Sequence, residues 1–220
     1  MQLAAVIVAR FVAFLETIDL NPRGRAYFPG IVPALTSRYG FAKFPQKLED
    51  FDESKGITFE GGRYQDVTIQ RVQIFTNVMV VETASSTGDS EKILEDALVW
   101  GSETFGLLYR PGMIKRKAYV SQLTFYSDSV LSKLNPALLK VAQILNARVP
   151  QYFGYELKYK PSAFVISYDP LEIRNGAAQF SIEARAEVPY VENKYFSTAP
   201  LPTEEHIELL QTLESDLLSS

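Results

Sequence analysis

The N-terminal stretch of this chain is apolar on both faces of an extended strand. From Ile7 to Leu15 every second side chain is apolar, and on the other phase Arg10 is the single charge before Glu16. Two apolar faces at period two are typical of a strand that is covered on both sides. We therefore expect a buried central strand here. The run is interrupted before the roughly 20 apolar residues of a membrane span, and no basic residue precedes it as in a secretion signal, so we expect no membrane association.

The chain contains no cysteine, so no disulfide can stabilise it. With 220 residues, 46% of them hydrophobic, it is long enough to bury a full core as one large domain, or as a domain with an appendage. The lack of cysteine also suits a reducing compartment, and we expect a cytoplasmic protein.

Only one histidine, His206, occurs in the sequence. Cysteine and histidine supply most thiolate and imidazole nucleophiles, most general bases near neutral pH and nearly all zinc sites. We therefore expect no metal and no cofactor, and His206 is expected to be a solvent-exposed helix residue. The sequence does not decide whether the chain is an enzyme, and these missing residue types favour a protein without catalytic activity. A carboxylate mechanism would need Glu82 or Asp96 near an arginine in a deep pocket.

The order of predicted elements indicates an α+β fold: a mostly antiparallel twisted sheet with a central N-terminal strand, packed by two main helices plus a C-terminal helix. The first main helix starts near Asp89, with Ser86 as its cap, and the second follows the Asn135-Pro136 pair. A shorter helix ends at Gly40. Further strands are expected at 57–59, 67–74, 78–82, 119–126, 153–160, 164–168 and 178–188.

Two local features of the strand region are expected from composition. Gly61-Gly62 is typical of a turn. The apolar phase slips by one residue near Gln70-Arg71, which indicates a β-bulge. We see no repeat of the solenoid kind.

The C-terminal segment is expected to be an appendage. We predict a single α+β domain over 1–196, followed by a linker and an amphipathic helix over 197–220. The helix carries a leucine-rich stripe, which must be buried either on its own domain or on a partner. The stripe consists of Ile207, Leu210, Leu213 and Leu217.

Tyrosines gather in the second half of the chain. Tyrosine is enriched at interfaces because its ring is apolar and its hydroxyl can stay hydrated. Packing within the sheet or core is the alternative. The candidate interface residues of this group are Tyr155, Tyr159, Tyr190 and Tyr195.

A basic run lies before one predicted strand. It could bind phosphates while Tyr119 stacks a base, or it could protect a strand edge from mispairing. The net charge of −4 and the sequence pI of about 5.2 oppose general nucleic-acid binding. The patch consists of Arg110, Lys115, Arg116, Lys117 and Tyr119.

These patterns favour a non-enzymatic subunit of a larger cytosolic complex, which acts through a protein partner or by self-association. The alternative is a ligand- or nucleic-acid-binding module that uses the basic and aromatic patch.

Overall fold

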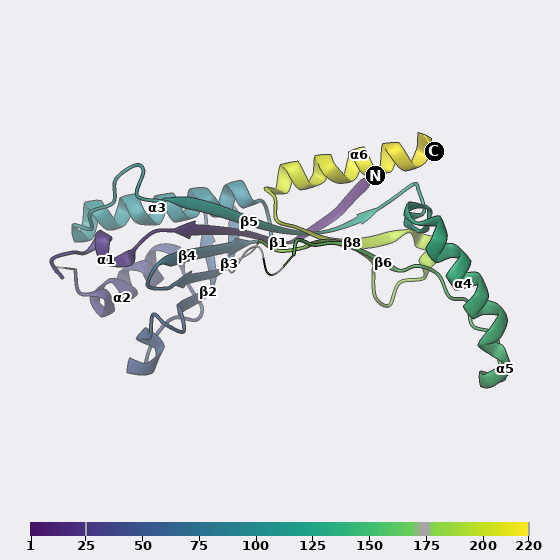
Figure 1. Ribbon diagram of the computed structural model, residues 1–220. Helices are drawn as coiled ribbons and strands as arrows, with labels where there is room; N and C mark the ends of the chain where they lie inside the picture. The colour runs from purple at the N-terminus through teal and green to yellow at the C-terminus, as the bar shows by residue number, and fades with distance from the viewer. Residues whose placement is uncertain (25, 170, 172–176, 220) are drawn as a thin grey trace. The chain divides into compact units, whose positions relative to one another are not determined.

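The computed structural model describes residues 1–24, 26–169, 171 and 177–219, and it confirms the α+β class. The sheet is antiparallel and open, with strand order β2-β3-β4-β1-β5-β8-β7-β6 (Figure 1), so the N-terminal strand is central as expected. The strands are β1 (Gln2–Phe14), β2 (Ile57–Tyr64), β3 (Val67–Ile74), β4 (Val78–Thr83), β5 (Arg116–Tyr126), β6 (Ala163–Ile166), β7 (Phe180–Ala184) and β8 (Lys194–Ala199). The helices are α1 (Thr17–Leu20), α2 (Phe28–Tyr39), α3 (Thr87–Phe105), α4 (Pro136–Arg148), α5 (Pro150–Phe153) and α6 (Thr203–Ser219), with short 3-10 turns η1 (Leu48–Phe51), η2 (Leu131–Leu134) and η3 (Tyr190–Glu192).

The chain divides into two compact units. The first unit comprises Val6–Gln122 and Pro200–Glu204, and the second comprises Met1–Ala5, Leu123–Ala199 and Glu205–Ser220. Strands β1 and β5 and helix α6 contribute residues to both units. The boundary expected at residue 197 therefore does not coincide with this division, and the prediction of one folding domain over 1–196 stays a prediction.

The two halves of the chain repeat one order of elements. Strand β1, helix α2, the β2–β4 meander and helix α3 are followed by β5, α4, the β6–β8 meander and α6. In each half the first strand neighbours the last strand of its meander. Strands β4 and β8 both have six residues, and three residues separate each of them from a helix that begins with threonine, Thr87 or Thr203.

The β2–β4 meander confirms one predicted feature and corrects another. The pairing of β3 with β4 shifts in register between Ile69 and Arg71, so the predicted bulge is confirmed. The predicted Gly61-Gly62 turn is wrong, because β2 continues through both glycines. A Cβ atom on Gly62 would lie 2.5 Å from the Phe41 ring, so this glycine allows the ring to pack across the strand.

Helices α2 and α3 cover the core of the first unit. Helix α3 begins after Ser86, whose hydroxyl accepts a hydrogen bond from the Asp89 amide at 3.0 Å, and this confirms the predicted cap. Helix α2 ends where Gly40 adopts φ 64°, also as predicted. The apolar residues of both helices pack with Phe11, Phe59 and Val81 of the sheet.

The opposite face of these strands carries a row of alternating charges. Side chains that face one another across β1, β4, β3 and β2 form successive ion pairs: Arg10 with Glu82 at 2.7 Å, and Arg71 with Glu82 at 4.0 Å and with Glu60 at 3.5 Å. Lys43, which forms an isolated bridge with Glu60 beside β2, adds a further ion pair with Glu60 at 3.0 Å. On this face the β1 side chains are half-buried, whereas Ala9, Phe11 and Ala13 on the other face are buried. The expected cover on both faces is wrong.

Helix α6 packs on its own chain. Leu210 and Leu217 are buried, and the Glu214 carboxylate accepts bonds from the Ser127 hydroxyl at 2.7 Å and the Asp128 amide at 2.8 Å. Burial opposes ionisation of this carboxyl group, yet these bonds and one from the Met1 amino group hold the pKa of Glu214 below its ordinary value.

His206 is fully buried, so its expected exposure is wrong. The Ser197 hydroxyl donates its proton to the Ser181 carbonyl at 2.8 Å, and it therefore accepts the Nε2–H of His206, also at 2.8 Å. The ring meets Phe180 edge-on. Burial lowers the pKa of His206 to about 4, so the imidazole is neutral at physiological pH.

Two predicted strands of the second unit differ from the structure. The strand predicted at 153–160 is absent, because Tyr159 exchanges its backbone bonds with the Asn146 side chain instead of a neighbouring strand. The strand predicted at 178–188 is shortened to β7, because Glu187 has φ 65° and the chain turns there. The start of α4 is as predicted, with Asn135 accepting from the Ala137 amide.

No helix within the described residues has the length and apolar character needed to cross a membrane.

Candidate functional site

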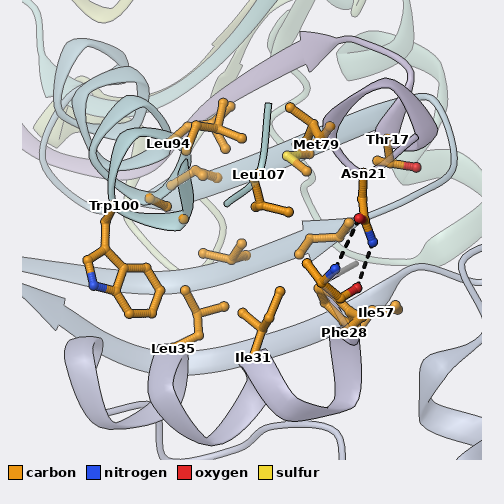
Figure 2. A pocket seen from close by; sticks show the side chains of 18 of the residues that line it. Thr17, Asn21, Phe28, Ile31, Leu35, Ile57, Met79, Leu94, Trp100 and Leu107 are labelled. Atoms are coloured by element: carbon orange, nitrogen blue, oxygen red, sulfur yellow. Dashed lines mark hydrogen bonds between the residues drawn. The ribbon is translucent and has the colours of Figure 1, made fainter. Parts of the chain in front are cut away.

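The first unit holds an apolar cavity of about 390 Å³ between its two long helices and one face of its strands. We call it the α2–α3 cavity. Figure 2 shows Ile31 and Leu35 of α2, and Leu94 and Trp100 of α3, directed towards the same space. The strands contribute apolar side chains from that one face: Ile57, Val72, Ile74, Met79 and Val81.

Small residues on α3 leave this space open. Ala97 and Gly101 lie on the lining face of the helix, where larger side chains would project into the cavity. At Gly101 a Cβ atom would lie 2.8 Å from Leu107 Cδ1, so the glycine allows Leu107 to fold back over the helix end. Figure 2 shows Leu107 between the two helices.

An ion pair beside the cavity fixes α2 to α3. The Arg38 guanidinium binds the Asp96 carboxylate at 2.9 Å and lies 5.1 Å from the centre of the Trp100 ring. The Tyr39 hydroxyl donates to the same carboxylate at 2.5 Å. Burial and this hydrogen bond both raise the pKa of Tyr39, so the phenol stays protonated.

Apart from the Tyr39 hydroxyl, which binds Asp96, the polar side chains of the lining gather around Thr17 at one end. Thr17, Glu53 and Thr76 lie there beside the exposed side chain of Ile18, which marks where the cavity meets solvent. The Thr17 hydroxyl is 2.7 Å from the Thr76 carbonyl and 3.3 Å from Glu53 Oε2. Asn21 uses both ends of its amide on Ala26, as the dashed lines in Figure 2 show.

The chemistry of this lining is that of a binding site. Glu53 and Tyr39 are the ionisable groups among its described residues, and all but a few of the others are aliphatic or aromatic. Such a surface offers dispersion contacts and desolvation to an apolar molecule, with hydrogen-bond acceptors at one end. Within the described part of the chain, no three His, Cys, Asp or Glu side chains are grouped so that they could hold a metal ion.

The two carboxylates considered for catalysis do lie beside arginines. Glu82 belongs to the charged row on the opposite face of the sheet, and Asp96 joins α2 to α3. Each is part of an ion pair that holds the fold.

The predicted basic patch is largely engaged within the first unit. Glu91 of α3 binds both the Lys117 ammonium and, at 3.0 Å, the Tyr119 hydroxyl, and its hydrogen bond raises the pKa of Lys117. The Tyr119 ring packs against Phe11, and the Arg116 guanidinium lies 3.9 Å from the Phe14 ring centre. Arg110 and Lys115 are exposed. Nucleic-acid binding by this patch stays a prediction.

The candidate interface residues are separated by the fold. Tyr155, Tyr159 and Tyr190 are exposed, whereas Tyr195 is buried and contacts Phe125. In the helix stripe, Leu210 and Leu217 are buried within the second unit, and Ile207 and Leu213 are half-buried. Most of the helix stripe is thus buried within the chain itself, and Tyr155, Tyr159 and Tyr190 are the candidate interface residues that stay exposed.

Sequence reasoning missed the α2–α3 cavity, because its lining comes from segments as distant as Thr17 and Leu107. The signal that could have indicated it is the pair of small residues, Ala97 and Gly101, on the apolar face of α3. The chain matches no protein-family model, and no curated protein matches it at significant similarity.

Proposed function

We propose that this protein binds a small apolar molecule in the α2–α3 cavity. The observation that carries the proposal is the cavity itself: about 390 Å³ of apolar space, formed where a folded unit would otherwise pack its core. Protein interiors are close-packed, and atoms that line an empty space lose their dispersion contacts. An apolar ligand would restore them, and the volume falls at the small end of known ligand sites, which span about 300–1,000 Å³.

The lining favours a ligand with an apolar body and at most one polar end. Its polar groups lie at the solvent end, where Glu53 and Thr76 offer oxygen acceptors. A hydroxyl group at that end of a ligand could donate to them while the rest of the molecule lies among the aliphatic side chains. A ligand that is polar at both ends would leave one polar group unpaired against aliphatic side chains, which is unfavourable.

Trp100 makes the proposal directly measurable. It is the single tryptophan of the chain and it lines the cavity. Straight-chain alcohols of increasing length should change its fluorescence and raise the melting temperature. Since each buried methylene contributes about 0.8 kcal/mol, affinity should rise about fourfold per added carbon until the cavity is filled, and then level off.

A filling substitution supplies the control. Ala97→Phe places a ring in the cavity and should abolish binding. Val99→Phe, a change of similar size on the same helix at an exposed position outside the lining, should leave it intact. Unchanged Trp100 fluorescence and melting temperature across the whole alcohol series would refute the proposal, as would equal binding by Ala97→Phe.

Protein contact is a second candidate function, and the observation that favours it lies in the second unit. Helix α4 exposes several apolar side chains along its length. A role as a cytoplasmic subunit that associates with itself or with a partner is therefore retained as a proposal.

A further inference from the structure

Helix α4 displays an apolar surface that the described chain does not cover. Leu138 is 44% exposed, Val141 50% and Ile144 52%, and Ala142 is the one buried residue of the helix. Tyr152 and Phe153 of α5 extend the surface. Soluble proteins rarely expose contiguous apolar patches without a binding role. We call the exposed side chains of α4 and α5 the α4 surface.

The internal repeat shows what covers such a helix. Helix α4 occupies the place in the second repeat that α2 occupies in the first, between the first strand and the meander. Helix α2 buries Ile31, Val32, Leu35 and Tyr39 against its unit. The main neighbours of α4 are instead η2 and α5, and Figure 1 shows α4 extending away from β6.

The sheet of the second unit lacks the corresponding cover. Ile166 on β6 pairs with Phe180 on β7, and Phe180 contacts His206, so Ile166 lies on the face that α6 packs against. Yet Ile166 is 55% exposed. Its counterparts on β2, Ile57 and Phe59, are buried in the first unit. The second unit thus has both an uncovered helix and an uncovered sheet edge.

The charges on α4 and α6 indicate where α4 docks. In α4 the ionisable residues are Lys140 and Arg148, both basic, whereas α6 carries acidic residues and neither lysine nor arginine, and its one histidine, His206, is buried and neutral. In the first unit the two equivalent helices are joined by an ion pair between a basic and an acidic side chain, Arg38 of α2 and Asp96 of α3. The acidic residues of α6 are Glu204, Glu205, Glu208, Glu214 and Asp216, all but Glu214 exposed.

We propose that two copies of this chain associate by exchanging α4, so that the α4 surface of each lies on β6 and β7 of the other, beside α6. Such an exchange is isologous and closed, because the same contact forms twice in the dimer. This contact corresponds to the one that α2 makes with its own unit in the first repeat. Within one copy, Asn146 bonds the amide and carbonyl of Tyr159 and so holds α4 against the segment that follows it. The exchange does not depend on ligand binding in the first unit.

The first test is the mass of the full chain in solution by light scattering and sedimentation, over a range of concentrations. We expect a dimer. Val141→Asp and Ile144→Asp should raise its dissociation constant about tenfold or more, because each places a charge in the proposed apolar contact. Both side chains are exposed in the single copy, so its fold should survive. Val99→Asp, at an exposed apolar position of α3, is the matched control and should leave the dimer intact.

Charge reversal tests the placement of α4 beside α6. The variant Lys140→Glu/Arg148→Glu should not dimerise, and neither should Glu205→Lys/Glu208→Lys. Mixed together, they should form a heterodimer, because each α4 then meets an α6 of opposite charge. A monomeric wild-type chain, a dimer insensitive to Val141→Asp and Ile144→Asp, or a mixture that stays monomeric would each overturn the proposal.

Discussion

Thr87 and Thr203 cap each other. The amide of Thr87 donates to the Thr203 hydroxyl at 3.0 Å, and the amide of Thr203 donates to the Thr87 hydroxyl at 2.9 Å. Both residues are buried, and they are the first residues of α3 and α6. Helix N-termini leave amides without intrahelical partners. Here two helices at equivalent places in the repeat satisfy one another's first amide.

This reciprocal pair should be strongly coupled. Thr87→Ala or Thr203→Ala leaves a buried amide without its acceptor, which should lower the free energy of unfolding by about 1–3 kcal/mol. In a double-mutant cycle the two losses should not add, because the two hydroxyls also contact each other at 3.4 Å and either change removes that shared contact. Thr87→Ser and Thr203→Ser keep the hydroxyl and serve as controls. Additive losses in urea denaturation would contradict the coupling.

Burial of neutral His206 predicts a pH dependence. Its folded pKa of about 4 lies below the ordinary value of 6.5, so the unfolded chain binds a proton first as pH falls. Stability should therefore decline from pH 6.5 towards pH 4, by up to about 3 kcal/mol. Protonation of carboxylates such as Glu214 adds to the decline at the acid end.

The variant His206→Gln isolates the contribution of the histidine. Its amide can still donate to Ser197, but it does not titrate, so the difference in unfolding free energy between wild type and variant should shrink as pH falls from 6.5 to 5. A difference that stays constant over this range would show that His206 is protonated in the folded protein or exposed.

The ion pair between Arg38 and Asp96 should control access to the α2–α3 cavity. Asp96→Asn removes the charge that holds Arg38 over Trp100, and it should lower the free energy of unfolding by about 1–2 kcal/mol. Trp100 should also become more accessible to acrylamide quenching. Glu103→Gln, an exposed change on the same helix, should alter neither quantity. Equal quenching in Asp96→Asn and wild type would show that the ion pair does not cover the tryptophan.

The ion pairs of the charged row across β1–β4 should contribute unequally to the free energy of unfolding. The Glu82 side chain is 8% exposed between two arginines, whereas Glu60 is 31% exposed. Glu82→Gln should cost about 1.5–3 kcal/mol of unfolding free energy, because the buried carboxylate accepts a charge-assisted hydrogen bond from Arg10 that a neutral amide cannot reproduce. Glu60→Gln should cost less than about 1 kcal/mol, since water can replace the lost interaction. Thermal denaturation of the two variants at neutral pH compares them, and equal losses would contradict this difference in burial.

The internal repeat is not detectable as amino-acid identity between the two halves of the chain. When residues 78–103 are set beside residues 194–219, they agree only at Thr87 with Thr203 and at Leu94 with Leu210. These are a shared cap and two buried leucines. A repeat preserved only in element order and in such contacts becomes visible only when the strand order is known.

The sequence by itself determined the local structure. The caps of α3 and α4, the end of α2 at Gly40, the bulge in β3 and the central β1 depend on side chains a few residues apart, so their patterns predict them. Tertiary structure decided the rest. Gly62 continues a strand because Phe41 packs on it, and His206 is buried because α6 meets β7 and β8. The α2–α3 cavity exists because helices from distant segments close over one sheet face. These outcomes depend on which distant surfaces meet, and no local pattern encodes that.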